Sequence, residues 1–249
     1  MRRDRAPGAT LPTMTPWASI DLYCERLDPG LLAEPLNLVS NAAFFIAAFM
    51  GALWLRAQPS PHRALWALPL IAACIGVGSS LFHSVATGWA LIADVVPIGL
   101  YLVTYLGVTT RLLLRFSWKQ VFAAYAAFLG VNAACILLIS GESVGGSQGY
   151  FGSAATLFAL GVGLRHSHPR PSRLFLYAGA LFCLSLTCRS VDAMLCASIP
   201  LGTHWAWHIL NGAVVACTLR AAIMLDAHRS SSAIVPLVPG AAPDSSSRP

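Results

Sequence analysis

The 249-residue chain contains few charged residues. Asp, Glu, Lys and Arg make up 10% of it, whereas hydrophobic residues make up 56% and the mean hydropathy is +0.66. Soluble domains carry about 25% charged residues, so this composition excludes an ordinary soluble globular protein. The Lys and Arg residues also form no stripe interleaved with aromatic residues. This pattern argues against nucleic acid as a partner.

Long apolar stretches are present instead. A membrane-spanning helix needs about 20 predominantly apolar residues. Seven candidate stretches run over residues 36–55, 65–82, 89–110, 122–139, 150–164, 174–195 and 204–225. The fifth is short and rich in glycine, and a count of six would put both chain ends on one side of the membrane. The sequence predicts an all-α integral membrane protein, a bundle of seven transmembrane helices.

The distribution of Lys and Arg predicts the orientation of the bundle. The first, third and fifth connections contain these residues, and the second, fourth and sixth contain none. Positively charged loops stay in the cytoplasm, so we expect the N-terminus outside and the C-terminus in the cytoplasm. Arg2, Arg3 and Arg5 favour the inverted orientation, which stays open as the alternative.

Three regions follow from these stretches. We expect residues 1–35 to form an extracytoplasmic segment and residues 36–225 to form the membrane domain. Residues 226–249 are rich in Ser, Pro and Ala. Such a composition is typical of disorder, so we expect a disordered cytoplasmic tail.

Few ionisable side chains lie in the predicted spans, and each is therefore a candidate functional residue. Asp94 and Asp192 are the acidic residues found there. His83 ends the second stretch and His204 begins the seventh, so with seven spans both lie at the outer end of the bundle. His208 follows four residues after His204, on the same helical face. The three imidazoles can therefore converge on one point.

This pattern favours a catalytic metal site. Three protein ligands and a fourth position open to water are typical of catalytic zinc, and the chain has no Cys-x-x-Cys pair of the structural kind. Ser79 lies one turn before His83, and Asp94 lies about one turn into the third stretch, at a similar depth. A hydroxyl and a carboxylate beside a metal suit metal-assisted hydrolysis. Haem held by two histidines is an alternative, as is a packing role for each residue alone.

The order and spacing of these motifs resemble the alkaline ceramidase family, in a superfamily of seven-helix membrane hydrolases that includes the adiponectin receptors. The similar segments are GVGSSLFHS, Asp94, HWAWH, DLYCERLDPGLLAEPLNLVSN and RSVDAMLC. The resemblance implies a zinc-dependent amidase that cleaves ceramide, or a related N-acyl lipid, into a sphingoid base and a fatty acid. It assigns zinc to His83, His204 and His208. It implies that the carboxylate of Asp94 acts on the zinc-bound water. It also implies that the hydroxyl of Ser79 lies beside the reacting carbonyl.

A disulfide is also implied by the resemblance. Members of the family pair a cysteine before the first span with one after the sixth, and these are Cys24 and Cys196 here. Both positions are expected outside the cell, where a disulfide persists. Two free thiols are the alternative.

A calcium site before the first helix is implied in the same way. Glu25 and Glu34 match the family's acidic positions, and Asp21 and Asp28 are further candidate ligands because calcium takes six to eight oxygens. The spacing in this segment departs from the animal pattern. A solvated acidic face is the alternative.

The sequence thus predicts a membrane-embedded zinc hydrolase whose partners are the bilayer and a lipid substrate, with its site near the extracytoplasmic leaflet. A seven-helix receptor with a structural zinc site is the rival interpretation, and it predicts tolerance of Asp94→Asn. Arg189 and Asp192 lie three residues apart, a spacing that predicts an ion pair within the sixth stretch.

Overall fold

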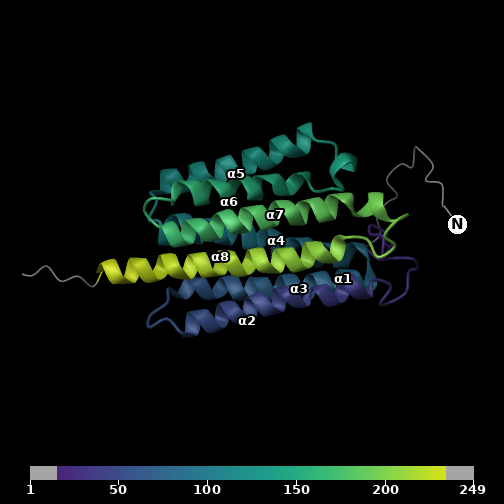
Figure 1. Cartoon of the computed structure of the whole chain (residues 1–249), viewed down its shortest axis with the longest axis horizontal. Coiled ribbons are helices and arrows are strands. Elements are labelled where there is room, and N and C mark those ends of the chain that lie inside the picture. Colours follow the sequence, from purple (N-terminus) through teal and green to yellow (C-terminus); the bar gives the residue numbers. More distant parts are fainter. Residues whose placement is uncertain (1–15, 234–249) are drawn as a thin grey trace, which may run out of the picture.

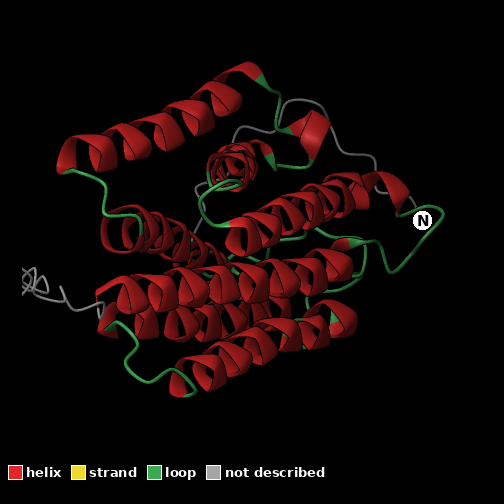
Figure 2. Cartoon of the chain, turned by 60° about the vertical axis from the view of Figure 1, so that its left-hand side comes forward, coloured by secondary structure: helices red, strands yellow, loops and turns green. Residues whose placement is uncertain are grey.

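The computed structural model describes residues 16–233, which form a bundle of helices (Figure 1). The α-helices are α1 (Pro35–Ser40), α2 (Ala42–Arg56), α3 (Ala67–Val85), α4 (Gly88–Gly107), α5 (Trp118–Leu138), α6 (Phe151–Gly163), α7 (Pro169–Leu195) and α8 (His204–Ala233). Shorter helical turns are η1 (Arg63–Trp66), η2 (Val108–Leu113), η3 (Glu142–Val144) and η4 (Gln148–Tyr150). Within these residues Figure 2 shows helices and loops without a strand, which confirms the all-α prediction.

Six of the described helical segments are long and apolar enough to cross a membrane. The fifth predicted stretch is also helical, as α6, but it has 13 residues and is about 20 Å long at 1.5 Å per residue. It packs against α5 and α7 (Figure 1). With α6 as a seventh crossing, the described chain ends lie at opposite ends of the bundle. Which end faces the cytoplasm stays a prediction.

Helix boundaries follow local sequence signals. The Ser117 side chain caps α5 by accepting from the backbone N–H of Gln120, whose side chain returns the contact, and α7 begins at Pro169, a residue suited to a first helical position. The last helix, α8, continues past Leu225 to Ala233, so the expected tail is helical at its start. The rest of that tail, residues 234–249, and the expected N-terminal residues 1–15 lie outside the described part of the chain.

Close helix packing fixes the arrangement at two glycines. A Cβ atom on Gly78 of α3 would lie 1.9 Å from the carbonyl oxygen of Ala93 on α4, and one on Gly212 of α8 would lie 2.5 Å from the Cβ of Ala43 on α2. Small residues let helix backbones approach in this way within membranes. Helix α3 therefore packs closely against α4, and α8 packs closely against α2.

The segment before α1 folds over one end of the bundle, which we call the site end. Ser19 forms an isolated bridge with Thr87, and the backbone N–H of Ile20 donates to the carbonyl of Ala86, 2.7 Å away. The same end carries α1 and the start of α8 (Figure 1). The predicted disulfide between Cys24 and Cys196 is present and joins this segment to the end of α7.

Candidate metal centre

The three predicted histidines meet at the site end and form what we call the histidine cluster, His83, His204 and His208. His83 comes from the last turns of α3, and the other two come from the first turns of α8. One potential ligand atom from each lies within 4.8 Å of the others. The three side chains are buried, with exposed fractions of 0%, 2% and 1%. The cluster can hold a metal ion, as the i, i+4 spacing and the helix count predicted.

The tautomers of two rings follow from their hydrogen bonds. Nδ1 of His83 lies 2.6 Å from Oε2 of Glu34, and a carboxylate only accepts, so Nδ1 carries the proton. Nδ1 of His208 lies 2.7 Å from the hydroxyl of Ser40, which already donates to the carbonyl of Asn37. His208 therefore also donates through Nδ1. In both rings Nε2 is left with a lone pair that can bind a metal.

Buried nitrogens without partners support this interpretation. Nε2 of His83 and Nδ1 of His204 are buried and have no hydrogen-bond partner. A buried polar atom without a partner costs about 1–3 kcal/mol. Neutral imidazole nitrogens in a dry site are the donors that zinc and similar metals take. The residues present therefore fit a bound metal ion.

Tyr23 covers the cluster from the N-terminal segment. Its ring stacks on the imidazole of His204, with centroids 3.5 Å apart and planes 13° from parallel. It also lies 5.5 Å from the ring of His83. Burial raises the pKa of the Tyr23 hydroxyl, which therefore stays protonated. Tyr23 lies in the segment DLYCERLDPGLLAEPLNLVSN, but no sequence pattern predicted a role for it.

Ser79 and Asp94 lie beside the histidine cluster. Ser79 is buried on α3, one turn from His83. The carboxyl group of Asp94, on α4, interacts with the Ser79 hydroxyl and with His83. The glycine at position 78 makes this proximity possible, because its missing side chain lets α4 approach α3 at Ala93 and Asp94. A hydroxyl, a carboxylate and the three imidazoles are thus gathered in one layer.

The two buried acidic residues considered for calcium, Glu25 and Glu34, have other partners. Both carboxylate oxygens of Glu25 accept backbone N–H groups of α1, from Leu36 at 2.6 Å and Asn37 at 2.8 Å. Such a carboxylate at a helix N-terminus is stabilising. Asp21 and Asp28 are exposed, and the chain brings the four carboxylates into no common cluster among the described residues.

Glu34 connects the segment before α1 to the histidine cluster. Its carboxylate accepts hydrogen bonds from Arg26, His83 and Asn37. Burial opposes the charged form, but these hydrogen bonds hold the pKa of the Glu34 carboxyl group below its usual value. Glu34 therefore remains a carboxylate although only 1% of it is exposed. Orienting a ligand histidine through a carboxylate is a recurring feature of metal sites.

Asp192 and Arg189 do not form the ion pair that their spacing predicted. Oδ1 of Asp192 accepts the backbone N–H groups of Thr203 and His204, at 2.6 and 2.9 Å, and Oδ2 accepts that of Cys24 at 3.0 Å. The guanidinium of Arg189 instead donates to the carbonyl of Gly145 and lies 5.6 Å from the ring of Trp207. The start of a helix has unpaired backbone N–H groups and a partial positive charge, so it binds a carboxylate such as that of Asp192.

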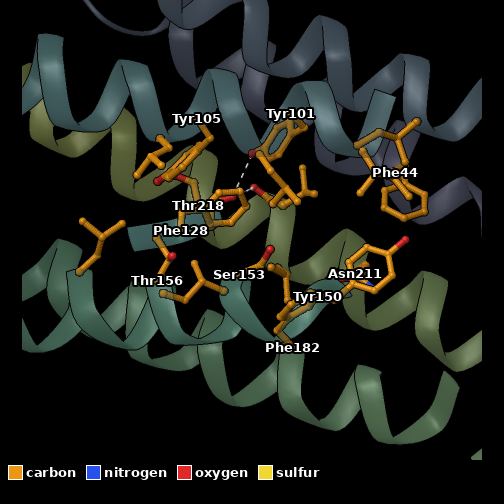
Figure 3. Close-up of a pocket in the computed structure, with 18 of the residues that line it drawn as sticks. Phe44, Tyr101, Tyr105, Phe128, Tyr150, Ser153, Thr156, Phe182, Asn211 and Thr218 are labelled. Atoms are coloured by element: carbon orange, nitrogen blue, oxygen red, sulfur yellow. Dashed lines mark hydrogen bonds between the residues drawn. The ribbon is translucent and has the colours of Figure 1, made fainter. Parts of the chain in front are cut away.

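An apolar pocket begins next to the histidine cluster. Phe44, whose ring lies 6.3 Å from that of His208, lines it together with Trp207 and Asn211. Figure 3 shows Tyr101 and Tyr105 of α4 on one side of this pocket and Ser153 and Thr156 of α6 on the other. The pocket therefore extends between the helices into the bundle, away from the site end.

Comparison with known proteins agrees with this geometry. A family model described as ceramidase matches residues 22–236. The matched region includes the histidine cluster, Ser79, Asp94, Glu34 and both cysteines of the disulfide. A search of curated proteins found no matching sequence.

Proposed function

The chain belongs to the ceramidase family, and from this we propose that it is a zinc-dependent hydrolase of the amide bond in ceramide or a related N-acyl lipid. The products would be a sphingoid base and a free fatty acid. The observation that carries the proposal is the buried histidine cluster, in which two imidazole nitrogens have no protein partner.

His83, His204 and His208 would hold the zinc ion. When bound there, zinc lowers the pKa of water to about 7 and polarises a carbonyl group. The chain contributes the orientation of the ligands: Glu34 fixes the ring of His83, and Ser40 fixes the ring of His208. The stacked ring of Tyr23 limits the movement of His204 and excludes bulk water from its face.

Asp94 would transfer the proton, and Ser79 would stabilise the negative charge that develops on the substrate. The carboxylate of Asp94 can take a proton from the attacking water and give it to the amide nitrogen, which must leave as an amine. The Ser79 hydroxyl can donate to the carbonyl oxygen as negative charge develops on it. Their proximity to each other and to His83 supports these roles.

The pocket beside Phe44 and Trp207 supports a lipid substrate. Its walls are mostly aromatic and aliphatic, with polar groups such as Ser153, Thr156 and Asn211 among them. An acyl chain of the substrate can lie in this pocket while the amide reaches the histidine cluster. The six candidate membrane spans of the described residues support a substrate that is itself a membrane lipid.

The test uses the purified full-length protein in detergent micelles. We expect about one zinc per chain by mass spectrometry, and release of fatty acid from a ceramide. His208→Ala should lose both zinc and turnover. Asp94→Asn should keep zinc and lose turnover by about 100-fold or more, which is the usual contribution of a general acid or base.

Glu142→Gln is the matched control, because Glu142 is exposed in η3 and the substitution removes a carboxylate that is not part of the histidine cluster. Full turnover in Asp94→Asn would favour the receptor with a structural metal instead. Zinc-loaded protein that releases no fatty acid from any ceramide or N-acyl lipid would reject the proposal.

A further inference from the structure

Arg26 is a buried cation whose guanidinium is surrounded by oxygen atoms. Its exposed fraction is 5%. Nε donates to Oε1 of Glu34, and one terminal nitrogen lies 3.3 Å from the carbonyl oxygen of Asp28 and 3.4 Å from that of Gly30. The other terminal nitrogen donates to the carbonyl oxygen of His83, 3.2 Å away. One carboxylate and three backbone carbonyls thus converge on one positive group.

This set of acceptors is the kind that a calcium ion takes. Calcium binds six to eight oxygens from carboxylates and backbone carbonyls. Here the guanidinium occupies the space at the centre, and the second acidic candidate, Glu25, has both oxygens engaged by the backbone of α1. A divalent cation would have to displace a fixed positive charge. The residues before α1 therefore do not fit a calcium ion.

We propose that Arg26 is a built-in cation that takes the place of a divalent ion at the site end. A buried carboxylate such as Glu34 needs an opposite charge, and arginine is positively charged at every physiological pH. Unlike a bound ion, it cannot dissociate. The folded site is consequently independent of the calcium concentration.

Arg26 also acts as a positioning residue for His83 through two routes. It holds the carboxylate of Glu34, which accepts the Nδ1 proton of the His83 ring. It also binds the backbone carbonyl of His83 directly, near the end of α3. Loss of the guanidinium would release both the ring and the helix end. An outer-shell partner of this kind contributes about 10–100-fold to metal affinity.

The first experiment needs no substitution. The full-length protein, dialysed free of loosely bound metal, is heated in detergent with and without millimolar calcium, and its calcium content is measured. We expect an unchanged unfolding midpoint and no retained calcium. One retained calcium per chain, or a midpoint that rises with calcium but not with magnesium, overturns the proposal.

The second experiment compares Arg26→Ala with Arg26→Lys and with the control Arg56→Ala, which removes an exposed arginine at the other end of the bundle. We expect Arg26→Ala to lower the unfolding midpoint, to weaken zinc retention by about 10–100-fold and to change the absorption spectrum of the cobalt-substituted cluster. Arg26→Lys should recover part of each loss, because it restores the charge without the planar fork.

An Arg26→Ala protein with the zinc retention and cobalt spectrum of the Arg56→Ala control overturns the positioning role. If Arg26→Ala does not fold, the zinc retention and cobalt spectrum of Arg26→Lys test the positioning role. The comparison with and without calcium then tests the replacement of the divalent ion. None of these measurements requires the protein to hydrolyse a lipid, and only a change in hydrolysis rate would rest on the proposed function. The calcium content, the midpoints and the cobalt spectrum therefore distinguish a failure of this inference from a failure of that function.

Discussion

The carboxylate of Asp192 accepts a hydrogen bond from the backbone N–H of His204, 2.9 Å away. One buried side chain on α7 thereby fixes the first residue of α8, which is also a candidate metal ligand. The same carboxylate binds the backbone N–H of Cys24, next to the disulfide between Cys24 and Cys196. Asp192 therefore holds three parts of the chain against the histidine cluster.

Replacement of Asp192 should weaken both the fold and the metal site. Hydrogen bonds to a charged acceptor contribute about 1.5–3 kcal/mol each, and Asp192→Ala leaves the N–H groups of Thr203 and His204 without their acceptor. We expect a lower unfolding midpoint and faster loss of zinc during dialysis. Asp192→Asn should be milder, because its amide oxygen still accepts. An alanine variant as stable as Glu142→Gln would contradict the role assigned to this carboxylate.

Gly78 should control the distance between Asp94 and the histidine cluster. In Gly78→Ala the new methyl group meets the Ala93 carbonyl, so α4 must move away from α3. Overpacking of this kind costs about 1–3 kcal/mol. We expect hydrolysis to fall at least about tenfold, because misplaced catalytic groups lose rate steeply, while the zinc content stays near that of the unaltered protein.

Gly99→Ala is the matched control for this experiment. Gly99 lies on the same helix as Asp94, and a Cβ atom there would meet nothing within 4 Å. Both variants are assayed for fatty-acid release and for zinc. Equal activities in the two would show that the close approach at Gly78 does not position Asp94.

Removal of the Ser40 hydroxyl should weaken metal binding without removing a ligand. Ser40 accepts the Nδ1 proton of His208 and so fixes the orientation of that ring. Loss of such an outer partner typically lowers metal affinity by about 10–100-fold. Zinc competition with a chromophoric chelator should show this for Ser40→Ala. Ser84→Ala, which removes a hydroxyl bonded only to the carbonyl of Ser80 on its own helix, should bind zinc as the unaltered protein does.

A larger side chain at Ser153 should shift substrate preference toward shorter acyl chains. Ser153 is buried on α6, and its hydroxyl faces the apolar pocket (Figure 3). Ser153→Leu fills part of the space proposed for the acyl chain. Relative rates on ceramides of increasing chain length measure the shift. Val162→Leu, an outward substitution on the same helix, should leave the chain-length profile unchanged, and an identical profile in both variants would place the acyl chain elsewhere.

The sequence was sufficient to locate the histidine cluster. The i, i+4 spacing of His204 and His208 depends on local helix geometry alone, and helix parity places His83 at the same end. The pairing of Cys24 with Cys196 came from the resemblance to the family, since spacing alone cannot choose among seven cysteines.

Long-range contacts could not be predicted in the same way. The guanidinium of Arg26 binds the carbonyl of His83, which is 57 residues away in the sequence. No local sequence pattern predicts such a contact. For Asp192, the local i, i+3 rule favoured Arg189, but the carboxylate instead binds backbone N–H groups at the start of α8. Backbone groups carry no sequence signature, so partners of this kind become visible only in the fold.

The disulfide joins cysteines that are 172 residues apart, and its second cysteine precedes the last helix by a few residues. During synthesis, Tyr23, Arg26 and Glu34 emerge first, but the two ligands that α8 contributes emerge last. A chain that stops short of α8 has one of the three histidines. A shortened or stalled product that lacks α8 therefore cannot assemble the histidine cluster.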